Sequence, residues 1–228
     1  MQYEYVLKDF YTEEEKQKIW NELQYLRSNE YGWLHPNKGN NACDADTGEV
    51  LLKDAIQYCV GYKDVMDQSI ALKSSIYIYG NKIWKWHKKL TKFNPIYHQL
   101  QEINNRTSVI TYYPNKSIYN KHRDCAFFTM LSYFYREPKN FTGGEFIVED
   151  RKYEINNGFT IIIPSFLEHG CAEVNIIDES KDDSGRFCVA NFFFQDNLKE
   201  RSNPEQYFLC GTENLDGRIV KFFDPEIL

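Results

Sequence analysis

The sequence predicts a mostly β protein with helices, an α+β chain in which a helical first half supports a sandwich or barrel of short strands. Apolar residues recur at helical spacing before residue 107, whereas later apolar runs are short, β-branched or aromatic, and separated by turns. The 228 residues are 42% hydrophobic and 16% aromatic, which is enough to bury a core. We expect one domain over 1–228, comprising helical support over 1–107, the strand-rich core over 108–196 and a C-terminal extension over 197–228.

The first half opens with a short extended segment, residues 3–7, and then a helix whose start is well marked. Thr12 and Glu15 have the spacing of a capping box, in which each side chain binds the backbone N–H of the other residue. The apolar stripe of this helix consists of Ile19, Leu23 and Leu26. We expect this stripe to face the core.

The rest of the first half alternates between loop and helix. Residues 31–61 are rich in Gly, Pro, Asn and Asp, which predicts a loop-rich region able to hold a covering segment. Residues 65–104 have helical spacing, interrupted at Gly80 and at Asn94-Pro95, where the proline suits the first turn of a new helix. This half therefore predicts a helical scaffold.

The second half consists of short apolar segments with turns between them. Their β-branched and aromatic residues predict strands, and many short strands in succession indicate a sandwich or barrel. The predicted strands are 108–113, 126–135, 144–148, 159–163, 171–174 and 186–194.

Charge and composition exclude several classes of protein. The formal net charge of −6 argues against a nucleic-acid partner, because an acidic molecule repels a polyanion. The basic stretch 82–92 predicts an amphipathic helix with a solvated lysine face. No apolar run approaches the ~20 residues that cross a bilayer, and the N-terminus lacks the layout of a signal peptide. We expect a soluble, cytoplasmic protein with free thiols and no membrane partner, whose oligomeric state the sequence leaves open.

Two histidines and an aspartate are candidates for a metal site. His122 and Asp124 are two residues apart, so on a strand both side chains would lie on the same face. His169 follows after further strands and turns. Two histidines and one carboxylate form the facial triad of non-haem iron(II) oxygenases, which leaves coordination positions open for cosubstrate and oxygen.

Arg186 is a candidate anchor for an anion. It opens the last predicted strand, in which the other residues are mainly apolar. A guanidinium offers a planar fork that binds a carboxylate through two hydrogen bonds. The alternative partner is an internal Asp or Glu.

The order of these motifs resembles that of the prolyl 4-hydroxylase-like iron(II)/2-oxoglutarate dioxygenases. The resemblance covers about residues 108–196. Its motifs are Tyr113-Pro114, His122-x-Asp124, Gly143-Gly144-Glu145-Phe146, Gly158, His169 and Gly185-Arg186. It implies a double-stranded β-helix, which is a jelly-roll barrel whose mouth holds the iron, with supporting helices outside one sheet.

The resemblance also implies roles for individual residues. His122, Asp124 and His169 resemble the iron(II) ligands, and Arg186 resembles the residue that pairs with the distal carboxylate of 2-oxoglutarate. Tyr113 and Tyr133 resemble the tyrosines that hydrogen-bond this cosubstrate. A shift of one residue in strand register would put neighbouring tyrosines on this face instead. Alternatively, Tyr113 and Tyr133 lie in the core or at the rim of the barrel and do not contact the cosubstrate. Those neighbours are Tyr112, Tyr119 and Tyr135.

The implied reaction is hydroxylation of an unactivated carbon with dioxygen, which releases succinate and carbon dioxide. The resemblance favours a prolyl residue in a peptide or protein as substrate, with ascorbate as a further cofactor and no catalytic side chain beyond the metal centre. A free amino acid or small metabolite is the first alternative substrate. A noncatalytic metal-binding or interaction module on the same barrel is the alternative from another class, because a fold alone does not decide function.

Overall fold

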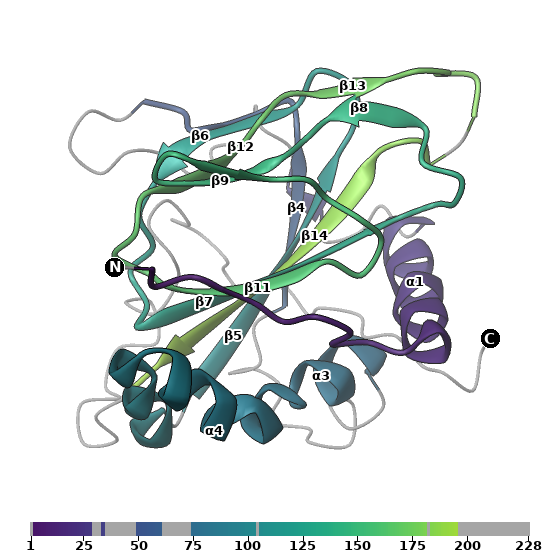
Figure 1. The fold of residues 1–228 in the computed structure, drawn as a ribbon. Coiled ribbons are helices and arrows are strands. Elements are labelled where there is room, and N and C mark those ends of the chain that lie inside the picture. The colour runs from purple at the N-terminus through teal and green to yellow at the C-terminus, as the bar shows by residue number, and fades with distance from the viewer. Residues whose placement is uncertain are drawn as a thin grey trace, which may run out of the picture.

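Two antiparallel sheets face each other in the computed structural model, and helices cover the outer face of the larger sheet (Figure 1). This arrangement matches the α+β sandwich or barrel that the sequence predicts. The N-terminal segment runs along the edge of the larger sheet. The structure describes residues 2–28, 33–34, 49–60, 74–103, 105–181 and 183–195.

The larger sheet has seven strands, and β14 and β7 lie at its centre. Every residue of β14 pairs with β5 on one side, and most pair with β7 on the other. The order across the sheet is β1 (Tyr5–Val6), β11 (Thr160–Pro164), β7 (Phe128–Tyr135), β14 (Arg186–Phe194), β5 (Asn105–Tyr113), β4 (Ile56–Val60) and β2 (Trp33–Leu34).

The smaller sheet has five strands and lies across the barrel from the larger one. Two further strands, β13 (Val174–Ile176) and β8 (Phe141–Gly143), pair only with each other and form a third, two-stranded sheet. The order across the five-stranded sheet is β10 (Arg151–Tyr153), β9 (Phe146–Val148), β12 (His169–Cys171), β6 (Ile118–His122) and β3 (Leu52–Lys53).

Side-chain alternation on β14 divides the core into two layers. Phe187, Val189 and Phe193 belong to the cluster between the larger sheet and the helices. Cys188, Ala190 and Phe192 belong to the cluster between the two sheets. Because alternate residues of a strand face opposite sides, Arg186 lies on the inner face, toward the barrel interior.

The first helix forms as its sequence predicts. α1 spans Glu13–Ser28. The backbone N–H of Glu15 donates to Thr12 Oγ1 at 3.2 Å, and the backbone N–H of Thr12 donates to Glu15 Oε2 at 2.9 Å. These bonds confirm the capping box. The predicted stripe is buried at Ile19, Leu23 and Leu26.

The remaining helices end where the predicted interruptions lie. α3 spans Ser75–Gly80, α4 spans Ile83–Phe93, and η2 is a 3-10 helix over Pro95–Glu102. Asn94 caps η2 by accepting from the backbone N–H of Ile96 at 3.1 Å. Ile83 and Leu90 of α4 are buried, whereas Lys85, Lys88 and Lys89 are partly or fully exposed. The lysine face is therefore solvated, as expected.

A buried carboxylate joins α1 to α3. Glu22 accepts a hydrogen bond from the Ser74 hydroxyl at 2.6 Å and another from the backbone N–H of Ile76 at 3.0 Å. Burial raises the pKa of Glu22 to about 7, although both hydrogen bonds oppose the rise.

The structure also differs from the sequence prediction. Three strands, β2, β3 and β4, lie within residues 31–61, where we expected loops, and β6, β8 and β10 were not predicted. The predicted strand 171–174 instead spans the end of β12, the start of β13 and the connection between them. β4 is a strand because it pairs with β5, a contact between segments about fifty residues apart. The support region 1–107 therefore contains strands as well as helices, and 197–228 lie outside the described residues. No helix in the described part of the chain is long and apolar enough to span a membrane.

Candidate metal centre and cosubstrate pocket

The smaller sheet brings the two predicted histidine ligands together. His122 ends β6 and His169 begins β12, and the two residues are direct partners in the antiparallel pairing of these strands. Asp124 lies just beyond the end of β6, where its backbone N–H donates to Ser165 O at 3.1 Å. Asp124 therefore lies outside the strand, but its carboxylate and the His122 ring point at the same volume, as their spacing predicts.

The three side chains form one compact cluster. His122 Nε2 lies 3.5 Å from Asp124 Oδ1, and His169 Nε2 lies 3.2 Å from Asp124 Oδ2. One donor atom from each residue lies within 4.8 Å of the others. Two imidazoles and one carboxylate are the donor set that suits iron(II) with open coordination positions. The three residues therefore fit such a metal.

Hydrogen bonds to the backbone set the orientation of both rings. His122 Nδ1 lies 2.9 Å from Asn120 O, and His169 Nδ1 lies 2.9 Å from Leu167 O. A carbonyl oxygen only accepts, so Nδ1 donates in each ring and Nε2 is the nitrogen directed at Asp124. This is the orientation that a metal ligand through Nε2 requires.

Neighbouring side chains hold Asp124 as an oriented carboxylate. The Thr129 hydroxyl donates to Asp124 Oδ2 at 2.6 Å, and Thr129 Oγ1 lies 2.9 Å from Ser165 Oγ. Burial by itself would raise the pKa of Asp124, but the adjacent His169 and His122 lower it well below its usual range. Asp124 is thus negatively charged before any metal arrives.

Arg186 is fully buried inside the barrel without an acidic partner among the described residues. Its guanidinium lies 4.3 Å from the centre of the Tyr113 ring and 4.7 Å from that of Tyr133. Nη2 contacts the thiol of Cys171, whereas Nε and Nη1 have no hydrogen-bond partner among the described residues. Among the described residues no Asp or Glu takes this role, so the guanidinium keeps two donors for an added anion.

Tyr113 and Tyr133 are the tyrosines beside Arg186, and both are almost completely buried. Burial raises the pKa of both phenols well above the usual range, so both remain neutral hydrogen-bond donors. Tyr112 faces the helices instead, with its ring centre 4.8 Å from that of Phe187. Tyr119 stacks on His122 at 4.0 Å. The pocket at Arg186 therefore contains the two predicted tyrosines.

The spacing between the metal cluster and Arg186 suits a short dicarboxylate. His169 and Cys171 are two residues apart on β12 and both are buried. Two residues on one strand face are about 7 Å apart. Because Cys171 touches Arg186, the guanidinium lies about one such repeat from the metal cluster. A five-carbon dicarboxylate has the length to reach from the metal to this guanidinium.

The predicted glycine turn brings the backbone close to Arg186. Gly144 has φ +72°, a conformation that favours glycine, and an added Cβ would lie 3.0 Å from Arg186 Nε and 3.1 Å from Val174 Cγ2. Gly144 therefore lies directly against Arg186, where a side chain would have no room.

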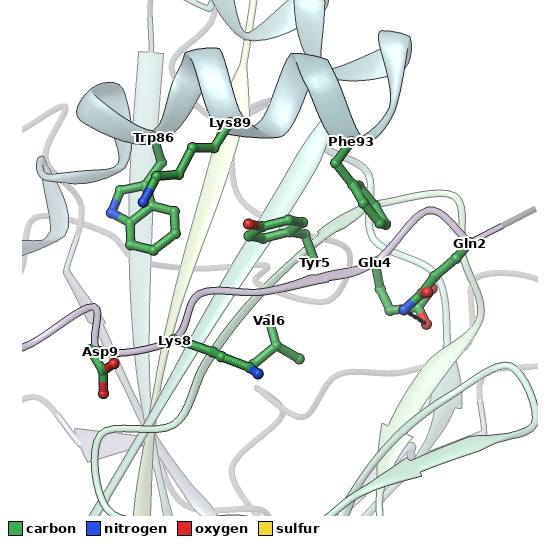
Figure 2. Close-up of a pocket in the computed structure, with 9 residues that line it drawn as sticks. All are labelled: Gln2, Glu4, Tyr5, Val6, Lys8, Asp9, Trp86, Lys89 and Phe93. Atoms are coloured by element: carbon green, nitrogen blue, oxygen red, sulfur yellow. Dashed lines mark hydrogen bonds between the residues drawn. The ribbon is translucent and has the colours of Figure 1, made fainter.

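A separate cleft of about 530 Å³ lies between the N-terminal segment and α4 (Figure 2). Tyr5 points toward α4, where its ring centre lies 5.0 Å from that of Phe93 and 6.3 Å from that of Trp86. Glu4 is buried and pairs with Arg151 of β10 at 2.6 Å. None of the predicted site residues lines this cleft, which indicates that it packs the N-terminal strand and is not part of the metal site.

Sequence reasoning missed three neighbours of the site. Cys171 and Cys188 are free buried thiols, as expected, but their position beside Arg186 and Tyr133 was not predicted. Tyr119 was named only as a register alternative, and it supports the ring of His122. Alternation along β12 from His169 would have placed Cys171 in the pocket.

Comparisons with known proteins agree with the fold. No protein-family model matches the chain, and no curated protein is significantly similar to it in sequence. A solved prolyl 4-hydroxylase from Pseudomonas putida is similar in structure, with a TM-score of 0.52 and 10% identity over 85% of this chain and 92% of that chain. A prolyl hydroxylase from Trichoplax adhaerens, in complex with a peptide fragment of the hypoxia inducible factor oxygen degradation domain, has a TM-score of 0.55 and 14% identity, covering 84% of this chain and 83% of that chain.

Both similar structures cover the helical layer as well as the barrel, since each aligns with more than four fifths of this chain. Together with the two facing sheets, they show that the chain has the double-stranded β-helix fold of the prolyl 4-hydroxylases, as its sequence motifs predict.

Proposed function

We propose that the protein is an iron(II)- and 2-oxoglutarate-dependent dioxygenase that hydroxylates an unactivated carbon, with a prolyl residue of a peptide or protein as the preferred substrate. The observation that carries the proposal is Arg186. A fully buried guanidinium with two nitrogens lacking a described partner lies in the same barrel as a His-Asp-His cluster. Burying a charge without a partner is unfavourable, so the arrangement fits a pocket completed by an anion.

The chain offers a place for each part of the proposed centre. His122, Asp124 and His169 would hold iron(II) through Nε2, a carboxylate oxygen and Nε2. Arg186 would bind the distal carboxylate of 2-oxoglutarate. The bound metal and cosubstrate supply the oxidising power, because 2-oxoglutarate is decarboxylated to succinate as dioxygen is consumed.

The other residues position groups and exclude water. Tyr113 and Tyr133 enclose the guanidinium from two sides and keep neutral hydroxyls available to the cosubstrate. Thr129 orients Asp124 by donating to Oδ2, the carboxylate oxygen that lies near His169, while Oδ1 lies near His122. No side chain is required to act as a general acid or base in this scheme.

The prolyl substrate is supported by the similar structures alone, one of which holds a peptide. A free amino acid or small metabolite is the alternative substrate within the same reaction class. A noncatalytic module is disfavoured, because a binding domain on this barrel has no use for a buried guanidinium prepared for a carboxylate. The acidic net charge continues to argue against nucleic acid.

The test is an anaerobic titration of the protein with iron(II) and then 2-oxoglutarate, followed by visible absorption. Chelation of iron by 2-oxoglutarate produces a charge-transfer band, and we expect saturation at one equivalent per chain. His169→Ala should abolish the band and Arg186→Gln should shift its midpoint to higher 2-oxoglutarate. A wild-type protein without the band refutes the proposed function.

Two further proposals concern the reductant that the enzyme uses and the compartment in which it works. We propose that ascorbate sustains turnover by keeping the iron reduced, and that the protein works in a reducing compartment such as the cytoplasm. Cys125, Cys171 and Cys188 are free thiols, which is typical of such compartments. Turnover assays with and without ascorbate test the first proposal, and localisation of a tagged chain tests the second.

A further inference from the structure

The guanidinium of Arg186 has one hydrogen-bonding neighbour inside the barrel, the thiol of Cys171. Nη2 contacts this thiol, whereas Nε and Nη1 have no hydrogen-bond partner among the described residues. Both side chains are buried. Cys171 lies on β12, two residues after His169, which is a candidate metal ligand. The contact therefore joins the strand of a metal ligand to the proposed anchor of the cosubstrate.

The nitrogen that contacts the thiol is the one that a carboxylate requires. A guanidinium binds a carboxylate through two parallel N–H groups, which come either from Nη1 and Nη2 or from Nε and Nη2. Nη2 takes part in both arrangements. Nε and Nη1 cannot form such a pair by themselves, because their N–H groups diverge. A carboxylate held by two hydrogen bonds of Arg186 must therefore take the position at Nη2 that the Cys171 thiol occupies.

The thiol is the part of this contact that is free to move. The guanidinium lies 4.3 Å from the centre of the Tyr113 ring and 4.7 Å from that of Tyr133. Gly144 lies so close that an added Cβ would be 3.0 Å from Arg186 Nε. The Cys171 side chain, by contrast, changes position by rotation about one bond, between staggered positions. An arriving carboxylate should therefore displace the sulfur and leave the guanidinium in place.

The thiol is also the weaker of the two partners for Arg186. A thiol sulfur is a weak hydrogen-bond acceptor, whereas hydrogen bonds to a carboxylate are assisted by its charge. When no carboxylate is bound, the thiol still reduces the cost of burying an N–H group without a partner. The Cys171 thiol thus stabilises the pocket without cosubstrate and competes with the cosubstrate for the same nitrogen.

We propose that Cys171 is a latch on the cosubstrate site, whose thiol holds Nη2 of Arg186 until the distal carboxylate of 2-oxoglutarate displaces it. This inference rests on the proposed function. It has a consequence that distinguishes the latch from an ordinary pocket residue. Displacing the thiol opposes binding, so removing the thiol should tighten the binding of 2-oxoglutarate. Truncation of a residue that only packs against the cosubstrate would weaken binding instead.

The experiment is the anaerobic titration of iron(II)-loaded protein with 2-oxoglutarate, followed by the charge-transfer band. Cys171→Ala should bind 2-oxoglutarate about two- to tenfold more tightly than the wild type, the scale of one neutral hydrogen bond. Cys171→Ser keeps an acceptor on a shorter bond, so its affinity should lie between these two. Cys188→Ala is the matched control, because Cys188 is equally buried and its hydrogen-bond partner is Tyr133. The control should not bind more tightly than the wild type.

Thermal melts give a second measurement that is independent of the band. Without cosubstrate, Cys171→Ala should melt at a lower temperature than the wild type, because Nη2 then lacks an acceptor. Saturating 2-oxoglutarate should reduce this difference, because the carboxylate then binds Nη2 in both proteins. A difference that is unchanged by 2-oxoglutarate would make the thiol a structural group and would overturn the latch.

The remaining outcomes separate the latch from the proposed function. An affinity of Cys171→Ala equal to or below that of the wild type overturns the latch. Equal tightening in Cys188→Ala also overturns it, since added space in the pocket would then explain the effect. If Cys171→Ala does not fold, Cys171→Ser is judged by the same criterion. A wild-type protein without the band refutes the proposed function and the latch together, whereas a normal band with unchanged affinities refutes the latch alone.

Discussion

The two ends of the barrel interior differ in burial and in chemistry. At the closed end, Arg186, Tyr113, Tyr133 and Cys171 are all buried, and the polar group at the centre lacks a described carboxylate partner. At the other end, near Asp124, the rings of Phe127 and Phe166 are partly exposed to water. The surroundings of Arg186 therefore exclude water, whereas the segments that flank Asp124 are in contact with it.

Removing a metal ligand should have the largest effect. His122→Ala, Asp124→Ala and His169→Ala should each abolish turnover and reduce bound iron well below one per chain, because each residue supplies one of three donor atoms. Folding stability should be largely retained, since these residues serve the metal and not the core. Iron content, 2-oxoglutarate consumption and thermal melts measure the three quantities.

His98→Ala is the control for these variants, because His98 is exposed and lies outside the cluster. It should keep wild-type iron content and turnover. If a ligand variant retained wild-type activity at saturating iron, the cluster would not be the metal centre.

Arg186→Gln should weaken 2-oxoglutarate by about 2–5 kcal/mol, the scale for removing one side of a buried charge pair. The smaller figure already raises the apparent dissociation constant more than tenfold. Arg186→Lys should fall between Gln and the wild type, because lysine keeps the charge and loses the planar fork. Iron binding measured without cosubstrate should change little. An Arg186→Gln protein that unfolds, or that binds 2-oxoglutarate normally, would make Arg186 a structural residue.

Tyr113→Phe and Tyr133→Phe should have smaller effects on the closed end. Each change removes a hydroxyl but keeps the ring against Arg186, so the expected loss is about 0.5–1.5 kcal/mol of 2-oxoglutarate binding. The matched control is Tyr112→Phe, on the opposite face of β5, where the hydroxyl accepts from Gly185 N–H. That control should affect stability only. Equal cosubstrate affinity in all three variants would show that Tyr113 and Tyr133 do not bind 2-oxoglutarate.

Glu22→Gln should have the smallest effect on cosubstrate binding. It tests whether the helices contribute to stability without affecting the site. Burial raises the pKa of Glu22 from 4.5 to about 7 in the folded protein. The folded state thus binds a proton more tightly than the unfolded state. The stability linked to that proton is complete below pH 4.5 and is lost as the pH rises through 7.

Glutamine cannot titrate, so the melting temperature of Glu22→Gln should rise relative to that of the wild type between pH 5 and 8, at unchanged 2-oxoglutarate affinity. The control is Glu14→Gln, at an exposed carboxylate on the same helix. A difference in melting temperature between Glu22→Gln and the wild type that stays constant with pH would show that Glu22 does not titrate in this range. A change in cosubstrate affinity would show that the helical layer acts on the closed end.

Much of the fold follows from local patterns in the sequence. The capping box at Thr12 and Glu15 predicts the start of α1, and Asn94-Pro95 predicts the start of η2, because these signals depend on residues within one helical turn. The long strand β14 was predicted at its observed bounds, since seven of its nine residues are apolar, including three consecutive phenylalanines. β4 and β6 were missed because each depends on a partner strand distant in sequence.

The candidate site was predictable in its members but not in its full geometry. The motif order identified His122, Asp124, His169 and Arg186, and the structure places the first three in one cluster. The position of Asp124 beyond the end of β6 depends on a backbone hydrogen bond to Ser165, which lies forty-one residues later. The exposure of Phe166 likewise depends on how segments far apart in the chain fold together, which no local pattern reports.

The position of β14 governs how the protein can fold during synthesis. β14 is the last described strand along the chain, yet it lies between β7 and β5 at the middle of the larger sheet. A nascent chain therefore presents two unpaired strand edges until residues 186–194 leave the ribosome, and such edges invite aggregation. Folding is expected to be completed after translation of this segment, and a chain truncated before it would be cleared by proteases without ever assembling a partly working barrel.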